Sequence, residues 1–282
     1  MHILHRTRRL IAKLSAKSEM DLQPEVERIS LANRKKAQKI VALSKGIREL
    51  QLTLFADRGD CVTGTTDPIS KFYPIEFRSV ENPIGTLFVF SGLAQYMGIP
   101  SREFFKTLEQ HNYNIAFFKD FDRCWYQKGV LGFSQSRHET AQKIEERFGD
   151  SPRPWHMIGS SAGGYAALVF GKMLGAERVI AYSPQTLINS KIFTAFGGAS
   201  KGDYDFNDPL NDVAQFLNDT KSDGSYDVHF GRKHSSDKHA AERLRDCPNC
   251  NLIAHNTNSH NIPLYLKESG SLMDTILPQS AK

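Results

Sequence analysis

Residues 155–171 read Trp155-His156-Met157-Ile158-Gly159-Ser160-Ser161-Ala162-Gly163-Gly164-Tyr165-Ala166-Ala167-Leu168-Val169-Phe170-Gly171, the most informative stretch of the chain. An apolar run leads into the pattern G-x-S-x-G, and a helix-like run follows it. Strand, tight turn and helix are the context of a nucleophile elbow, which lifts a serine hydroxyl above a sheet. The helix N-terminus then points free N–H groups at an oxyanion. The stretch predicts Ser161 as an activated nucleophile, and the alternative is a packing turn between strand and helix.

Short apolar runs alternate with helix-like segments from about residue 51 onward. The expected strands are 51–55, 74–78, 86–90, 114–118, 155–158, 178–182, 226–230 and 251–255. The expected helices are 101–111, 139–148, 163–174 and 236–244. Fully apolar strands are typical of a sheet that is buried on both faces. The alternation therefore predicts an α/β fold, with a doubly wound, mostly parallel sheet and helices on both faces.

Residues 1–50 differ from the rest in pattern and charge. They hold 12 Lys and Arg against 5 Asp and Glu, whereas the remainder holds 24 against 26. Their apolar spacing predicts two helices, separated near Asp21 and Pro24. We expect a basic helical N-terminal segment at 1–50 and a catalytic domain at 51–282. The segment is either an amphipathic helix that contacts an anionic membrane or polymer, or a solvated lead-in.

Composition narrows the class of protein. No apolar run approaches the length of a membrane span, and no apolar stretch of a signal peptide follows the basic N-terminus. The four cysteines, Cys61, Cys124, Cys247 and Cys250, are few and unevenly spaced, which predicts a reduced, cytoplasmic protein. No phosphate-binding loop or dinucleotide motif occurs, and no basic and aromatic residues interleave as on a nucleic-acid surface. We expect no nucleic-acid partner.

A nucleophilic serine needs a base, and the base needs an acid that orients it. Asp237 follows the expected strand 226–230, and His260 follows the expected strand 251–255. The order serine, acid, histidine, with each residue just after a strand, predicts the triad Ser161, Asp237 and His260. The alternative for Asp237 is an N-terminal cap of the next helix. Asp120 and Asp122 are weaker acid candidates.

Two backbone N–H groups are expected to hold the oxyanion. One belongs to Ala162, the residue after the nucleophile, and the other to Gly92 or Leu93, in the loop after the strand 86–90. The alternative for this loop is a plain strand-to-helix turn.

Two long insertions, 119–138 and 189–224, interrupt the alternation and follow strand ends, where open α/β sheets bind ligands. They are candidate lids. We predict that Trp125 and Tyr126 in the first insertion, and Tyr165 after the elbow, contact the substrate.

Two groups of residues have the chemical types of metal ligands, and neither has a convincing spacing for a metal site. His234, Asp237 and His239 have a ligand-like composition, but a surface loop explains them better. Cys247 and Cys250 form a single C-x-x-C without a second pair, which indicates a structural turn. We predict no metal site.

Gly159–Gly163, Asp237 and His260 together resemble the α/β-hydrolase superfamily over roughly residues 51–275. More narrowly, residues 159–167 with 182–186 are similar to a bacterial subgroup that occurs beside, or fused to, glycosyltransferases and cell-surface polysaccharide machinery. Capsule O-acetyltransferases are similar in kind. The resemblance implies acyl-enzyme chemistry at Ser161, supported by Asp237 and His260.

These observations together predict a serine-dependent acyl-transfer enzyme that acts on an ester, that of a carbohydrate or polysaccharide. It is an esterase if water is the second nucleophile and an O-acetyltransferase if a sugar hydroxyl is. We expect no bound cofactor, and acetyl-CoA is a candidate acyl donor. Two alternatives stay open: a catalytically silent hydrolase-fold protein that binds a polysaccharide assembly, and a peptidase.

Overall fold

The computed structural model describes residues 72–108, 111–197, 204–219 and 223–277, and shorter pieces at 35–36, 39, 43, 46–53, 55 and 61–63. The chain divides into two compact units, 1–53 and 54–282. In the first unit, residues 46–53 are helical. Most of the basic segment 1–50 lies outside the described residues, so its predicted helices and its contact with a membrane remain predictions.

The strand expected at 51–55 is wrong. Residues 51–53 and 55 are helical instead. A short apolar run does not distinguish a strand from a helix by periodicity alone, because both bury a few consecutive apolar side chains.

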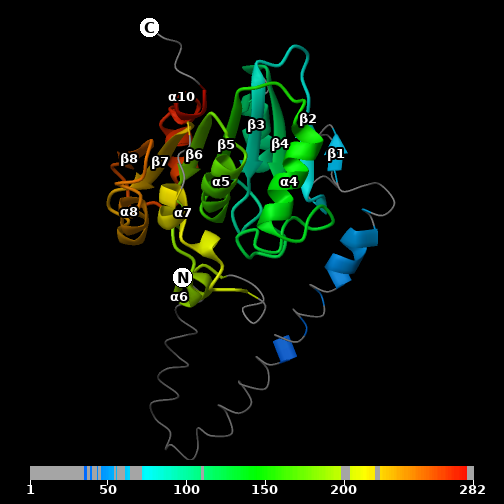
Figure 1. Cartoon of the computed structure of the whole chain (residues 1–282), viewed down its shortest axis with the longest axis horizontal. Helices are drawn as coiled ribbons and strands as arrows, with labels where there is room; N and C mark the ends of the chain where they lie inside the picture. The colour runs from blue at the N-terminus through cyan, green and yellow to red at the C-terminus, as the bar shows by residue number, and fades with distance from the viewer. Residues whose placement is uncertain are drawn as a thin grey trace, which may run out of the picture. The chain divides into compact units, whose positions relative to one another are not determined.

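The described residues form one eight-stranded sheet, with the order β1-β2-β4-β3-β5-β6-β7-β8 (Figure 1). Only the pair β2 and β4 is antiparallel among these strands; the other neighbours are parallel. The strands are β1 (Cys61–Thr63), β2 (Ile75–Arg78), β3 (Gly85–Phe90), β4 (Tyr113–Phe118), β5 (Trp155–Ser160), β6 (Arg178–Tyr182), β7 (Ser225–Gly231) and β8 (Cys250–His255).

Helices cover both faces of this sheet. The helices are α3 (Ser101–Leu108), α4 (Arg137–Phe148), α5 (Ala162–Met173), α6 (Ser190–Ala195), α7 (Val213–Asp219), α8 (Ser235–Glu242), α9 (Ile262–Glu268) and α10 (Leu272–Ile276), with a short 3-10 turn at Pro209–Asn211. One hydrophobic core joins the sheet to α4, α5, α7 and α8, and a second joins the opposite face to α3, α9 and α10. The predicted doubly wound α/β fold is therefore confirmed.

The central strands show why the sheet is buried on both faces. Every residue of β3, β4 and β5 is buried. Side chains of β3 alternate between the two cores, since Phe88 and Phe90 belong to one and Leu87 and Val89 to the other. Successive side chains of a strand point to opposite faces of the sheet. A continuous apolar run therefore contributes side chains to both cores.

The two insertions are bonded to each other. The side-chain amide of Gln127 donates to the Asp205 carbonyl at 2.8 Å and accepts from the Asp205 N–H at 2.7 Å. The buried guanidinium of Arg137 donates to Trp125 O at 3.0 Å and to Asp208 Oδ2 at 2.9 Å. Segments some 70 residues apart in sequence are thus joined by hydrogen bonds and by the ion pair of Arg137 with Asp208.

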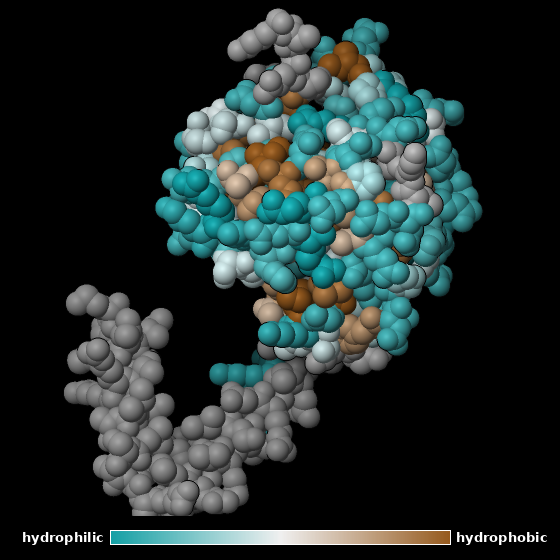
Figure 2. All heavy atoms as spheres, turned by 60° about the vertical axis from the view of Figure 1, so that its left-hand side comes forward, coloured by the Kyte–Doolittle hydropathy of each residue, from teal (hydrophilic) through white to brown (hydrophobic). Residues whose placement is uncertain are grey.

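The face of the molecule in Figure 2 is mainly hydrophilic and carries compact groups of hydrophobic residues. Large side chains that are strongly exposed in the described part of the second unit are Phe72, Ile84, Tyr96 and Leu264. No helix within the described residues combines the length and apolarity that crossing a bilayer requires.

Candidate active site

Ser161 occupies a strained turn between β5 and α5. Its backbone has φ 57° and ψ −119°, a conformation that a residue with a side chain rarely adopts. The strain is maintained because the Ser161 N–H donates to the Tyr182 carbonyl on the neighbouring strand at 2.8 Å. This geometry is that of the nucleophile elbow expected from G-x-S-x-G.

The glycines at both ends of the pattern are required by close backbone contact. A Cβ built on Gly159 would lie 1.9 Å from the Gly163 carbonyl oxygen, and a Cβ on Gly163 would lie 2.0 Å from the Phe90 carbonyl oxygen. Neither distance is compatible with any side chain. The absent side chains let α5 begin directly against β3 and β5.

The three residues predicted as a triad meet at this turn. His260 Nε2 lies 3.0 Å from Ser161 Oγ, and His260 Nδ1 lies 2.9 Å from both carboxylate oxygens of Asp237. Asp237 is buried, with an exposed fraction of 4%. Residues 99 positions apart in sequence are thus within hydrogen-bond distance, in the order that proton transfer from a serine requires.

Asp237 does not cap α8. The N-cap is His234, whose Nδ1 accepts the backbone N–H of Asp237 at 3.4 Å. The alternative interpretation of Asp237 as the cap is wrong, since Asp237 is the third residue of the helix and its carboxylate faces His260. His234 Nδ1 also lies 3.1 Å from Asp237 Oδ1.

His234, Asp237 and His260 bring three ligand-type atoms within 4.8 Å of one another. This cluster contains His260 where the sequence interpretation placed His239. The candidate ligand atoms already have hydrogen-bond partners. Asp237 bonds His260 Nδ1, and His234 Nδ1 accepts the backbone N–H of Asp237 at the start of α8. The arrangement is accounted for by a hydrogen-bonded triad with a helix cap beside it.

The loop after β3 lies against the elbow. A Cβ on Gly92 would come within 3.0 Å of the Ser160 carbonyl oxygen and 3.7 Å of the Ser161 Cβ. The Gly92 N–H is already donated to the Tyr96 carbonyl at 3.1 Å. Within the described residues, the N–H groups of Leu93 and Ala162 have no hydrogen-bond acceptor. Of the two residues predicted from this loop, Leu93 has the backbone donor that remains available.

The three aromatic side chains predicted to contact substrate are completely buried. Trp125 Nε1 donates to Gln185 Oε1 at 3.0 Å, Tyr126 OH bonds the carbonyls of Ser91 and Phe118 at 3.0 and 3.1 Å, and Tyr165 OH donates to the Leu210 carbonyl at 2.8 Å. The predicted substrate contact does not agree with this placement. Trp125 and Tyr126 belong to the insertion 119–138 and Tyr165 belongs to α5, and all three rings pack inside the domain. Aromatic residues in such positions pack in a core as readily as they bind a ligand.

Asp120, the weaker acid candidate, has a structural role. It is fully buried and accepts the backbone N–H groups of Cys124 and Tyr126 at 2.7 and 3.2 Å. Burial raises the pKa of its carboxyl to about 6, against the opposing effect of these two bonds. Asp120 therefore shapes the turn that carries Trp125 and Tyr126.

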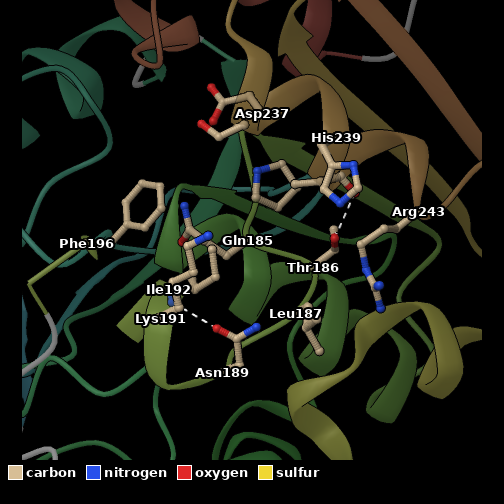
Figure 3. Close-up of a pocket in the computed structure, with 13 residues that line it drawn as sticks. Gln185, Thr186, Leu187, Asn189, Lys191, Ile192, Phe196, Asp237, His239 and Arg243 are labelled. Atoms are coloured by element: carbon tan, nitrogen blue, oxygen red, sulfur yellow. Dashed lines mark hydrogen bonds between the residues drawn. The ribbon is translucent and has the colours of Figure 1, made fainter. Parts of the chain in front are cut away.

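Two cavities adjoin the triad. One, of about 220 Å³, is lined by Ser161, His260 and Leu93. The other, of about 250 Å³, lies between the α6 segment and α8, with Ile192 and Arg243 on opposite sides (Figure 3). Phe196 lines both cavities, and its ring centroid lies 5.6 Å from that of His260. The 189–224 insertion thus contributes to both cavities.

Gln185 is the residue that the sequence interpretation did not single out. Its amide Nε2 donates to Ser161 Oγ at 3.2 Å. The only sequence signal was its place in Tyr182–Thr186, just after β6, where loops of parallel sheets reach the ligand site.

The C-x-x-C sequence lies where the turn after α8 leads into β8, with Cys247 in the turn, as predicted, and Cys250 as the first residue of β8. Cys247 is buried, and its sulfur donates weakly to the Ala214 carbonyl at 3.6 Å. Burial raises the pKa of the Cys250 thiol to about 12. In the described part of the chain, no cluster of metal-ligand type includes these two residues.

The sheet order, the elbow and the histidine and aspartate after β8 and β7 define the α/β-hydrolase fold, which solved structures bear out. A variant of the capsule O-acetyltransferase of Neisseria meningitidis serogroup A, in complex with CoA, is 17% identical over 71% of this chain and 91% of that chain, with a TM-score of 0.50. Alpha/beta hydrolase domain-containing protein 10 from mouse is 11% identical over 72% and 94%, with a TM-score of 0.46. MenH from S. aureus is 13% identical over 71% and 96%, with a TM-score of 0.46. Likeness at such identity concerns the fold alone.

No family model matches the sequence, and no curated protein matches it significantly. The arrangement of its strands and helices makes the chain an α/β-hydrolase-fold protein, as the resemblance implied.

Proposed function

We propose that this protein is a serine-dependent acyl-transfer enzyme, with Ser161 as nucleophile, His260 as general base and Asp237 as the acid that orients it. The observation that carries the proposal is the hydrogen-bonded sequence from Ser161 Oγ to His260 Nε2 at 3.0 Å and from His260 Nδ1 to Asp237 at 2.9 Å. Nucleophile, base and orienting acid within hydrogen-bond reach are the mark of an activated serine.

The first half-reaction forms an acyl-enzyme. Ser161 Oγ attacks the acyl carbonyl carbon, the hydroxyl proton passes to His260 Nε2, and the carbonyl electron pair moves onto oxygen. The N–H groups of Leu93 and Ala162 hold this oxyanion. Asp237 stabilises the imidazolium that forms. His260 then donates its proton to the leaving group.

The second half-reaction depends on the acceptor. Water gives an esterase and a sugar hydroxyl gives an O-acetyltransferase, and the same triad activates either one. We propose an acylated carbohydrate as product or substrate, and the cavity between α6 and α8 as the acceptor site. A capsule O-acetyltransferase with this fold has been seen with CoA, which makes acetyl-CoA the donor to test first.

Labelling with a fluorophosphonate tests the nucleophile. We expect wild-type protein to gain the mass of one adduct, mapped to Ser161 by peptide analysis. Ser161→Ala should gain none, and His260→Ala should react far more slowly. Wild-type protein that stays unmodified, with a cavity still open to the probe, would contradict the proposal and favour a binding protein with a hydrolase fold.

Turnover separates the two enzymatic forms. With acetyl-CoA as donor, we expect thiol release to depend on an added oligosaccharide. Equal thiol release without an acceptor indicates an esterase. Cleavage of a peptide library with no action on esters indicates a peptidase.

A further inference from the structure

We propose that Gln185 is a catalytic residue of this site, one that holds the nucleophile and stabilises the negative charge that develops on it. Gln185 follows β6, and its Nε2 donates to Ser161 Oγ at 3.2 Å. The inference deepens the proposed function and rests on it, since it assigns a second polar partner to the same reacting atom.

The orientation of the amide follows from chemistry. The Oε1 atom of Gln185 lies 3.0 Å from Trp125 Nε1. An indole nitrogen only donates, so the atom facing it has to be the amide oxygen. The amide NH2 group is thereby directed at Ser161 Oγ, and the reverse orientation would leave two donors facing each other at Trp125.

The partner that sets this orientation is itself immobilised. Trp125 is completely buried, and its ring packs against Phe193 and Tyr204 at centroid distances of 5.3 and 6.5 Å. Its backbone carbonyl accepts from Arg137 Nε at 3.0 Å. Gln185 is buried too, with an exposed fraction of 5%. A donor that is held in place before reaction needs no reorganisation when charge appears.

Ser161 Oγ has the bonding capacity that this role requires. Its single proton is directed at His260 Nε2, 3.0 Å away. A hydroxyl oxygen has two lone pairs, of which one accepts from Gln185 and the other is left for the carbonyl carbon. Three different partners can therefore engage the same oxygen at once.

The chemical effect arises in both half-reactions. As the O–H proton moves to His260 and the C–O bond forms, negative charge passes through Oγ, and the Gln185 N–H bond strengthens because its acceptor is charged. In deacylation the oxygen of water or of the acceptor hydroxyl bonds the acyl carbon as its proton passes to His260, and the bond from Oγ to that carbon then breaks. Oγ takes that electron pair and regains a proton from His260. The donor again stabilises the departing oxygen.

Figure 3 shows Gln185 at the cavity between the α6 segment and α8, whereas Leu93 lines the other cavity, with Ser161 and His260. The amide N–H that bonds Ser161 Oγ is a donor additional to the backbone N–H groups of Leu93 and Ala162. A purely structural amide would not have to place its donor on the reacting atom.

The test compares fluorophosphonate labelling rates of Gln185→Met, which has no donor but a similar shape, with wild type. We expect labelling about 10- to 100-fold slower, the range for a hydrogen bond to a group that becomes charged. Thermal unfolding serves as the folding control. Labelling of folded Gln185→Met at the wild-type rate would overturn the inference. A wild type that is not labelled at Ser161 would instead overturn the proposed function.

Gln185→Glu adds a pH readout. A carboxylate accepts but does not donate, whereas the protonated acid donates again, and burial favours the protonated form. The deficit of Gln185→Glu relative to wild type should therefore grow as pH rises, while that of Gln185→Met stays constant. Parallel pH profiles for the two variants would contradict a donor role.

Trp125→Phe in the wild-type background supplies a test that does not depend on the folding of a Gln185 variant, and the Gln185→Met background adds a double-mutant comparison. Removing the indole N–H frees the amide to turn, so labelling should slow in the wild-type background. In the Gln185→Met background the same change should have no further effect, because its partner is gone. Equal slowing in both backgrounds would show that Trp125 does not act through Gln185.

Discussion

The α-carbon of Gly163 faces the carbonyl of Phe90 so closely that a Cβ on Gly163 would lie 2.0 Å from the Phe90 oxygen. This contact joins the first turn of α5 to the end of β3. It brings the two segments that carry Ala162 and Leu93 together, and both residues have free backbone N–H groups within the described residues. The oxyanion site therefore depends on a missing side chain.

We predict that Gly163→Ala lowers the free energy of unfolding by about 2 kcal/mol or more, since overpacking forces the backbone to shift. Gly164→Ala is the matched control, because its Cβ would meet the Tyr182 carbonyl oxygen at 3.1 Å and Pro184 Cβ at 3.2 Å. Urea denaturation measures both. Equal losses would show that the contact with Phe90 is not the cause.

Replacing Asp237 by Asn should abolish most activity without unfolding the protein. The amide retains the shape but no longer stabilises the imidazolium or the correct tautomer of His260, and we expect a loss of roughly 10⁴-fold in kcat, as for other triads. Asp122→Asn serves as control, because Asp122 is the rival acid after β4. Kinetics on an activated ester would decide, and activity retained in Asp237→Asn would contradict the triad assignment.

Tyr126 is predicted to stabilise the oxyanion loop from behind. Tyr126→Phe removes the hydroxyl that bonds the Ser91 and Phe118 carbonyls, and within the described residues only the Phe118 carbonyl keeps another donor, the Ser91 N–H at 3.0 Å. The change should cost about 1–3 kcal/mol of stability and also slow fluorophosphonate labelling. Tyr165→Phe loses an equally buried bond, to Leu210, away from this loop. We expect similar destabilisation there with an unchanged labelling rate. A slower rate in both variants would indicate a general loosening of the domain.

Two buried imidazoles predict that acid destabilises the fold. Burial lowers the pKa of His156 to about 4 and that of His229 to about 3. Within the described residues, His156 Nδ1 and His229 Nε2 have no hydrogen-bond partner. The unfolded chain binds protons on both below pH 6.5 and the folded chain does not, so stability falls as pH drops from 6.5 to about 4.

For His156 alone this loss amounts to roughly 3 kcal/mol across the window. Asp120 has the opposite effect on stability, because burial raises the pKa of its carboxyl to about 6. Its contribution to the free energy of unfolding therefore falls as pH rises from about 4 to 6. The loss of unfolding free energy from the two imidazoles in acid is larger than the gain from the one carboxyl. Urea denaturation from pH 4 to 7.5 would show a shallower slope for His156→Leu than for wild type. Identical slopes would contradict the prediction.

Arg137 is expected to be the most sensitive cation in the described part of the domain. It is 1% exposed, and its guanidinium bonds Asp208, Tyr204 and Asn211, which belong to the other insertion. Arg137→Met should cost about 3–5 kcal/mol, because breaking a buried ion pair leaves its partner unpaired. Lys238→Met removes an exposed pair with Glu242 and should cost less than about 1 kcal/mol. Thermal unfolding measures both.

The fold and the three candidate catalytic residues could be predicted from the sequence because their signals are local. An apolar run, a turn of small residues and a helix have to follow one another to form the elbow around Ser161, and strand ends indicate where Asp237 and His260 fall. The topology of a parallel sheet then brings these loops to one edge. The mostly parallel sheet was predicted for the same reason. The helix at 51–53 was missed, because a short apolar run satisfies both periods.

The surroundings of the site were decided by packing between segments far apart in the chain. Trp125 is buried against Gln185, 60 residues away, and this contact directs an amide at Ser161. No spacing in the sequence distinguishes such a ring from one that binds substrate. The sequence by itself determined the order along the chain of the strands β2 to β8 and the chemical types at their ends, whereas β1 was not predicted. Only the tertiary structure decided which donors remain free and which rings are buried, because those properties depend on the complete set of neighbours around each atom.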